Sequence, residues 1–205
     1  EKENQLWVAT DGGGINIISL DDFSFTNIQQ KQDDVHSFPA NTIYRLYLDS
    51  ANNMWAGSIR RGLIGIRNVF ACSYQNVPFG NLYGLSNQAI NSFFQDSDGM
   101  VWVGTDGGGI NRFDPLTGTF KHYPSTMHEK VVSIVEYTPD ELLFSSFNEG
   151  LFIFHKQTGR VRPFVLVDKE TNDRECIDGF SVNIRRVTPD KILFSGQHIF
   201  IYDTT

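Results

Sequence analysis

The chain has 205 residues, of which 40% are hydrophobic and 13% aromatic, so it can build a folded core and is not a disordered tail. Its formal net charge of -7 argues against a phosphate-binding surface, so we expect no nucleic acid partner. Neither a long apolar run nor a basic leader with an apolar stretch is present, so we expect no membrane contact by this segment, with any anchor or export signal outside it.

A repeat with a period of about 45 to 50 residues is the main signal in the sequence. Three stretches, LWVATDGGGINII from Leu6, MWAGSIRRGLIGI from Met54 and VWVGTDGGGINRF from Val101, contain all 3 tryptophans. Weaker copies, LLFSSFNEGLFIF from Leu142 and ILFSGQHIFIY from Ile192, carry leucine in the tryptophan position. The aligned repeat residues are Trp7, Trp55, Trp102, Gly14, Gly62, Gly109 and Gly150. The three tryptophans are predicted to be core residues, because they lie on the repeated strand itself.

Each copy is predicted to form four short strands. In the third copy these are residues 90–95, 101–105, 110–113 and 119–123, joined by turns rich in Asp and Gly. Four antiparallel strands per repeat is the size of a propeller blade, and radial repetition buries each sheet against its neighbours. A two-layer sandwich also uses short strands, but it does not explain why Trp and Gly recur in phase.

The predicted fold class is therefore an all-β propeller of four-stranded antiparallel blades, as a single unit over residues 1–205. We expect three complete blades and two partial ones, because the first copy lacks an innermost strand and the last lacks a fourth. The expected blade pieces are residues 6–30, 41–80, 87–124, 131–166 and 182–205. This reading predicts a fragment of a larger propeller, whose partners are the remaining blades or further copies of itself.

Two segments carry a family resemblance. Leu48-Asp49 leads to Met54-Trp55-Ala56-Gly57-Ser58, and Gln95-Asp96-Ser97-Asp98-Gly99 leads to Val101-Trp102-Val103-Gly104-Thr105. Leu85-Ser86-Asn87 precedes an innermost strand, and Pro39-Ala40-Asn41 is a looser copy of that lead-in. These residues resemble the two-component regulator propeller repeat, whereas the fourth and fifth copies have lost the Trp.

The resemblance implies a role in signal transduction. Propellers of this kind form the periplasmic sensor region of hybrid two-component histidine kinases anchored in the inner membrane, where many take part in carbohydrate sensing ahead of a phosphorelay. The expected ligand is an oligosaccharide. No kinase domain is recognisable in this segment, so we expect no enzyme activity from it. The alternatives are a protein-interaction scaffold and a propeller polysaccharide lyase or glycosidase.

Motifs for other chemistry have structural explanations. The Asp-Gly-Gly-Gly runs at Asp11 and Asp106 lead into strands rather than helices, so they are predicted to be turns and not phosphate loops. The stretch 96–99 lacks the distal Glu of a calcium loop. The 5 histidines show no metal-ligand spacing, and the 2 cysteines, Cys72 and Cys176, are predicted to be buried hydrophobic residues. We therefore expect no catalytic residue, metal or cofactor.

A ligand site is expected where loops gather. In a meander of alternating strands, the turns between second and third strands lie on the same side as the lead-ins to the first strands, and binding residues concentrate on such loops. The candidate ligand-binding residues are Arg60, Arg61, Asn41, Asn87, Asp106, Asn148 and Glu149. The arginines suit carboxylate or sulfate groups of acidic sugars, although a solvated turn is the alternative. Tyr44, Tyr83 and Phe147 offer stacking surfaces or packing between blades.

Overall fold

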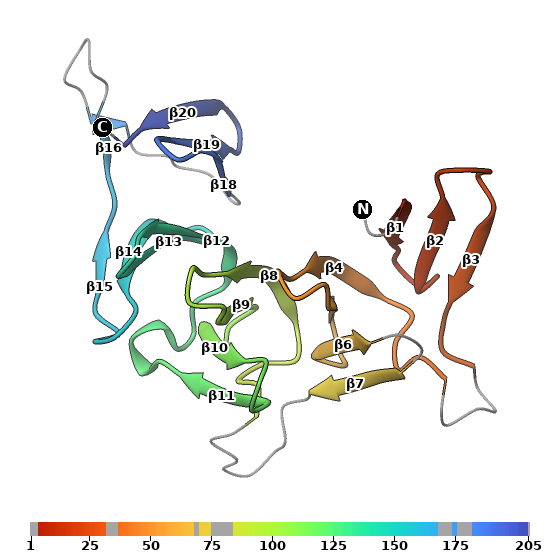
Figure 1. The fold of residues 1–205 in the computed structure, drawn as a ribbon. Helices are drawn as coiled ribbons and strands as arrows, with labels where there is room; N and C mark the ends of the chain where they lie inside the picture. Colours follow the sequence, from red (N-terminus) through yellow and green to blue (C-terminus); the bar gives the residue numbers. More distant parts are fainter. Residues whose placement is uncertain are drawn as a thin grey trace. The chain divides into compact units, whose positions relative to one another are not determined.

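The computed structural model describes residues 4–31, 37–67, 70–74, 84–167, 174–175 and 182–204 (Figure 1). These residues form an all-β structure with one short 3-10 turn. The chain divides into two compact units, Glu1–Asn91 and Ser92–Thr205. Cys72 and Cys176 are outside the side chains that the structure describes, so their predicted burial stays a prediction.

The first unit contains two antiparallel sheets. A three-stranded sheet is formed by β1 (Gln5–Ala9), β2 (Ile15–Ser19) and β3 (Phe25–Ile28), in that order. A four-stranded sheet is formed by β4 (Ile43–Leu48), β5 (Met54–Ser58), β6 (Leu63–Arg67) and β7 (Phe70–Tyr74). Each strand pairs with the next one along the chain, as in a meander.

The second unit continues the pattern. One four-stranded sheet is formed by β8 (Ile90–Gln95, which starts at the end of the first unit), β9 (Val101–Thr105), β10 (Ile110–Asp114) and β11 (Thr119–His122). A second is formed by β12 (Val131–Thr138), β13 (Glu141–Ser146), β14 (Gly150–His155) and β15 (Val161–Pro163). A three-stranded sheet follows, with β18 (Asn183–Thr188), β19 (Lys191–Ser195) and β20 (Ile199–Asp203). The 3-10 turn η1 spans Pro124–Thr126. The strands predicted for the third copy are confirmed to within one residue. A small pair, β16 (Leu166–Val167) with β17 (Arg174–Glu175), was not predicted.

Consecutive sheets pack through their apolar faces. Trp7 and Ile15 share a cluster with Met54, Ala56 and Ile64 of the following sheet. In the second unit, Trp102 and Ile110 pack with Leu142, Phe144 and Phe154, and Leu143, Leu151 and Ile153 pack with Ile184, Ile192 and Phe194. In these three sheets the tryptophan position therefore points at the next sheet, which explains why a large apolar residue is kept there.

A buried carboxylate fixes the first hairpin of the two sheets that carry a buried tryptophan. The indole Nε1 of Trp55 donates to Asp49 Oδ2 at 2.9 Å, and Trp102 Nε1 donates to Asp96 Oδ2 at 2.7 Å. The other carboxylate oxygen accepts two backbone N–H groups of the turn in both cases. Burial acts to raise the pKa of Asp49, but the hydrogen bonds from Trp55, Asn53 and Ala51 outweigh it and lower the pKa.

Trp7 differs from its two counterparts. Trp55 and Trp102 are fully buried, as predicted, whereas Trp7 is only partly buried. Its indole donates to Gln5 Oε1 at 3.2 Å, two residues away on the same strand, instead of to a buried aspartate. The prediction that all three tryptophans are core residues is therefore correct for two and only partly correct for Trp7.

Candidate functional site

The repeated glycines position the loops of the candidate site. Gly14, Gly62, Gly109 and Gly150 all adopt positive φ, between 69° and 93°. L-residues with a side chain rarely adopt this conformation, so the turn between the second and third strands favours glycine there. At Gly109 an added Cβ would also lie only 2.1 Å from the carbonyl oxygen of Thr126. The positive φ, with the close contact at Gly109, is thus the physical reason for the structural role predicted for these glycines.

The same glycines connect each turn to the next lead-in. The backbone N–H of Gly14 donates to the carbonyl of Asn41 at 2.7 Å, and that of Gly62 donates to Gln88 at 3.2 Å. In the second unit, Gly109 donates to Glu129 at 3.1 Å. Each acceptor lies two residues before the first strand of the following sheet. Within each unit, therefore, the turns and lead-ins do lie side by side, as the meander predicted.

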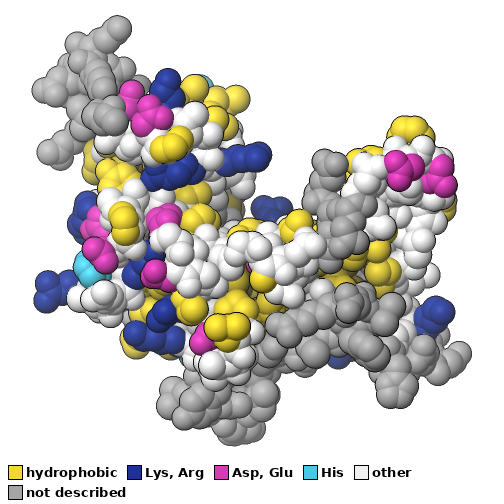
Figure 2. Space-filling view, in the orientation of Figure 1, with side chains coloured by type: hydrophobic (Ala, Val, Ile, Leu, Met, Phe, Trp, Pro, Cys, Tyr) yellow, Lys and Arg dark blue, Asp and Glu magenta, His cyan; other side chains and the backbone are white. Residues whose placement is uncertain are grey.

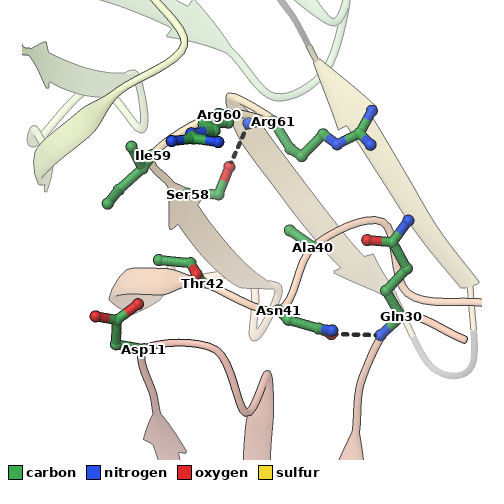
Figure 3. A pocket seen from close by; sticks show the side chains of 9 residues that line it. All are labelled: Asp11, Gln30, Ala40, Asn41, Thr42, Ser58, Ile59, Arg60 and Arg61. Atoms are coloured by element: carbon green, nitrogen blue, oxygen red, sulfur yellow. Dashed lines mark hydrogen bonds between the residues drawn. The ribbon is translucent and has the colours of Figure 1, made fainter.

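The first unit has a pocket of about 460 Å³ at this junction. It is an open pocket lined by the β1–β2 turn, the segment after β3, the lead-in to β4 and the β5–β6 turn (Figure 3). The lining residues are Asp11, Gln30, Ala40, Asn41, Thr42, Ser58, Ile59, Arg60 and Arg61. Three of the predicted ligand-binding residues, Asn41, Arg60 and Arg61, thus line one pocket.

Local hydrogen bonds set the shape of this pocket. Asn41 Oδ1 accepts the backbone N–H of Gln30 at 2.6 Å, which joins the end of the first sheet to the β4 lead-in. The backbone N–H of Arg61 donates to Ser58 Oγ at 2.8 Å and closes the β5–β6 turn. Figure 3 shows Arg60 and Arg61 on this turn and the Asp11 carboxylate on the other side of the pocket. The described residues provide no ion pair for Arg60.

Asp11 and Gln30 are site residues that the sequence analysis did not put forward. The repeat places Asp11 on the loop face at the same position as Asp106, but only Asp106 was included among the candidate ligand-binding residues. Gln30 lies just past β3 and has no repeat signature. The signal for Asp11 was available in the sequence, whereas that for Gln30 was not, because its position depends on the hydrogen bond to Asn41.

Asn87 has a structural role in the lead-in to β8. Its Oδ1 accepts the backbone N–H of Ala89 at 2.9 Å, which forms a local turn ahead of the strand. Tyr44 is an exposed residue of β4, while Tyr83 is outside the described residues. The ligand-binding role expected for Asn87 stays a prediction.

The remaining candidates lie in the second unit, Asp106 on the β9–β10 turn and Asn148 and Glu149 on the β13–β14 turn. The Lys130 ammonium is 3.6 Å from Asp106 Oδ1, and it lies 5.8 Å from the centre of the Phe147 ring. Asn148 has a φ of 65° and helps to form the β13–β14 turn. Because this ion pair is exposed, it contributes little stability. The prediction that these residues bind ligand stays a prediction.

The second unit also contains a buried charged group that the sequence did not reveal. Lys156 is only 8% exposed, and its ammonium contacts both Asp96 Oδ2, at 3.3 Å, and Glu136 Oε1. Asp96 comes from the β8–β9 turn, whereas Lys156 and Glu136 belong to the neighbouring β12–β15 sheet and its β14–β15 turn. The group therefore joins two sheets at the end opposite to the repeated glycines.

Two further features, a metal site and a membrane-spanning helix, are absent from the described part of the chain. No cluster of three or more His, Cys, Asp or Glu residues there has the geometry to hold a metal ion. No helix within those residues is long and apolar enough to cross a membrane.

The family of the repeat follows from a comparison with known families. The model named "Two component regulator propeller" matches residues 37–60 and 84–107. These two segments are two-component regulator propeller repeats. Both matched segments run from a lead-in through the first strand, the aspartate turn and the tryptophan strand, so the buried Asp-Trp pair lies within each repeat. The predicted resemblance is confirmed.

Solved structures confirm the fold class. The chain resembles the extracellular domain of the putative one component system BT4673 from B. thetaiotaomicron, with 20% identity and a TM-score of 0.77 over 98% of this chain and 26% of that one. It also resembles the extracellular domain of the putative hybrid two component system BT3049 from the same organism, with 20% identity and a TM-score of 0.75 over 99% and 32% of the two chains. The chain thus spans about a quarter to a third of their length.

An enzyme shares the same architecture. Virginiamycin B lyase from Staphylococcus aureus is 14% identical, with a TM-score of 0.64 over 98% of this chain and 67% of that one. At this identity the likeness concerns the fold alone. No curated protein matches the chain. Together these comparisons identify the stacked four-stranded sheets as part of a β-propeller.

Proposed function

We propose that the chain is part of the extracytoplasmic sensor region of a hybrid two-component histidine kinase and that it binds an oligosaccharide. The two matched repeats support the signalling role. The similar structures are extracellular domains of putative one component and hybrid two component systems, which supports a periplasmic location. In this proposal the propeller is the rigid recognition part, and a kinase elsewhere in the parent protein provides the catalysis.

The pocket of the first unit is the proposed ligand site. A volume of about 460 Å³ is in the range of small-molecule sites. Its lining offers hydroxyl, amide and carboxylate groups from Thr42, Gln30 and Asp11, which suit the hydroxyl groups of a sugar. Four separate segments of a packed scaffold supply these groups, so their arrangement is largely set before a ligand arrives.

The environment of the Arg60 guanidinium is the observation that best supports the proposal. Its guanidinium lines the pocket without an ion pair to any described carboxylate, and Arg61 follows it on the same turn. A guanidinium presents a planar set of donors that matches a carboxylate or a sulfate. The expected ligand is therefore an acidic oligosaccharide, such as one containing a uronic acid or a sulfated sugar.

Calorimetric titration with a panel of acidic and neutral oligosaccharides tests the binding half of the proposal. We expect an acidic member to bind and Arg60→Ala to weaken its binding by about 10- to 100-fold, because a charge-assisted hydrogen bond is lost. Arg60→Lys should restore part of the affinity by keeping the charge. Arg160→Ala is the matched control, because Arg160 is an exposed arginine outside the pocket.

The opposite outcome is equally clear. Equal binding of neutral and acidic sugars, or an equal loss of affinity with Arg160→Ala, would show that Arg60 does not contact the ligand. No binding by any oligosaccharide would favour an interaction scaffold. The signalling half is tested separately by the coding sequence that flanks residues 1–205, where we expect a membrane-spanning helix and a kinase domain.

A further inference from the structure

Two junctions between consecutive sheets share one backbone geometry. The first junction comprises the β1–β2 turn and the lead-in to β4, and the second comprises the β9–β10 turn and the lead-in to β12. In the first, the backbone N–H and the hydroxyl of Thr10 donate to the carbonyl of Gly14 at 3.1 and 2.9 Å. In the second, the same two groups of Thr105 donate to the carbonyl of Gly109 at the same two distances. The two junctions can therefore be compared residue by residue.

Two pairs of side chains occupy equivalent positions in these junctions. Asp11 and Asp106 directly follow the turn threonine. The repeat glycine of each turn donates to the carbonyl that lies two residues before the next strand. The residue between that carbonyl and the strand is Thr42 in the first junction and Lys130 in the second. The aspartates thus match, whereas the lead-in residues differ in length and charge.

The two aspartates therefore differ in their partner. The Lys130 ammonium lies 3.6 Å from Asp106 Oδ1. In the first junction Thr42 has no charge to offer, and no cation of the described residues lies within ion-pair distance of Asp11. Both lead-ins belong to the sheet that follows the aspartate turn, and both of these sheets are described. The difference is therefore a property of the side chain at this position of the repeat.

The pocket of the first unit holds two opposite charges that do not neutralise each other. Over the β12–β15 sheet, acidic and basic side chains lie side by side (Figure 2), and Arg162 pairs there with Glu141 at 3.2 Å. Asp11 and Arg60, in contrast, line one pocket from different sides without forming an ion pair (Figure 3). A purely acidic ligand would be attracted by Arg60 and repelled by Asp11. A ligand with a cation as well as an anion satisfies both.

We infer that the ligand of this pocket is zwitterionic and that its ammonium group binds Asp11 in the place that the Lys130 ammonium takes beside Asp106. The acidic group of the ligand binds Arg60, so this inference rests on the proposed function and specifies its ligand. The chemical class is an oligosaccharide that joins a uronic acid to an amino sugar with an unacetylated amine. The short Thr42 side chain leaves room for that amine in a pocket of about 460 Å³.

Calorimetric titration with two disaccharides tests the inference. The probes are a glucosamine–uronic acid disaccharide with an unsubstituted amine and its N-acetylated form, at about pH 6, where the amine is charged. The wild type should bind the amine form about 5- to 10-fold more tightly, because the bound ligand shields the ammonium–carboxylate pair from water. Asp11→Asn should remove this preference. Asp140→Asn, at an exposed aspartate of the β12–β13 turn outside the pocket, is the matched control and should keep it.

A second variant introduces the cation of the other junction. Thr42→Lys places an ammonium beside Asp11, so it should also remove the preference for the amine form. Arg60→Ala should weaken the binding of both forms by the same factor, because both carry the uronic acid. Circular dichroism checks that each variant is folded.

The possible failures separate this inference from the proposed function. Equal binding of the two forms by the wild type, or a preference that survives Asp11→Asn, would overturn the inference and leave the acidic-oligosaccharide site in place. The inference is also wrong if neither disaccharide binds while another acidic oligosaccharide does. If no oligosaccharide binds, the proposed ligand class fails and the inference fails with it.

Discussion

The sheets with a buried tryptophan and the sheets without one close their first hairpin in different ways. In the β4–β7 and β8–β11 sheets, a buried aspartate receives both the turn amides and the indole N–H. In the β12–β15 and β18–β20 sheets, leucine replaces the tryptophan and no aspartate occupies the matching position. A tight turn, Pro139-Asp140 or Pro189-Asp190, joins the strands instead.

This difference shows that the aspartate and the tryptophan form one unit. A buried carboxylate without its indole donor, or an indole without its acceptor, leaves a polar group unpaired in the core at a cost of about 1–3 kcal/mol. Replacing both with apolar groups and a shorter turn avoids this cost. The two residues are therefore absent together from the β12–β15 and β18–β20 sheets. In the β12–β15 sheet, Leu143 maintains the apolar packing towards the next sheet.

The two aspartates also differ from each other, and this gives the largest expected effect. Asp96→Ala should destabilise the protein by about 3–5 kcal/mol, because it removes a partner of the buried Lys156 ammonium. Asp49→Ala should cost only about 1–3 kcal/mol, since the partners of Asp49 are neutral donors and no buried cation is left without its partner. Thermal and urea unfolding of both variants measures the difference. Equal losses would show that Lys156 adds nothing to the Asp96 site.

Substitutions at two repeat glycines distinguish the energetic cost of a positive φ from the cost of a steric clash. Gly109→Ala should cost about 2–4 kcal/mol, because positive φ is combined with a Cβ contact to Thr126 O. Gly150→Ala should cost about 1–2 kcal/mol, since Gly150 has positive φ but no atom lies within 4 Å of an added Cβ. Unfolding midpoints of the two variants provide the test, and a larger loss at Gly150 would contradict this explanation.

The loss of stability on replacing a tryptophan with phenylalanine should depend on its burial and on its hydrogen-bond partner. Trp102→Phe should cost about 1–3 kcal/mol, because Asp96 loses its indole donor in the core. Trp7→Phe should change stability by about 0.5 kcal/mol or less, because Trp7 is partly buried and its indole donates to a glutamine on the same strand. Thermal and urea unfolding of both variants measures the difference in stability. A comparable loss at both positions would contradict this expectation.

The smallest effect concerns acid stability at Asp49. Its pKa is lower in the folded protein than the usual value of about 4, so the charged carboxylate contributes stability that is fully present above that value. This contribution is lost as the pH falls through the depressed folded pKa. Asp49→Asn should therefore show a smaller drop in stability between about pH 7 and pH 3 than the wild type. An unchanged drop would exclude Asp49 as a source of acid sensitivity.

Much of the candidate site could be predicted from the repeat, and the rest could not. Asn41, Arg60 and Arg61 were expected on neighbouring loops, and they line one pocket. Lys156 had no signature, because its partners Asp96 and Glu136 are distant in sequence and meet only when two sheets pack. The Asp-Trp pair did leave a signal, since both pairs are six residues apart and the fourth and fifth copies lack both residues.

The sequence by itself determined the strands, the turns and the phase of the repeat, because these depend on alternating apolar residues and on glycines with positive φ. Only the tertiary structure decided which faces are covered. Ile15 and Ile199 are the same amino acid at the same position of the repeat, yet one is buried and the other exposed. Burial depends on a neighbouring sheet, and a repeat does not encode which of its copies has one.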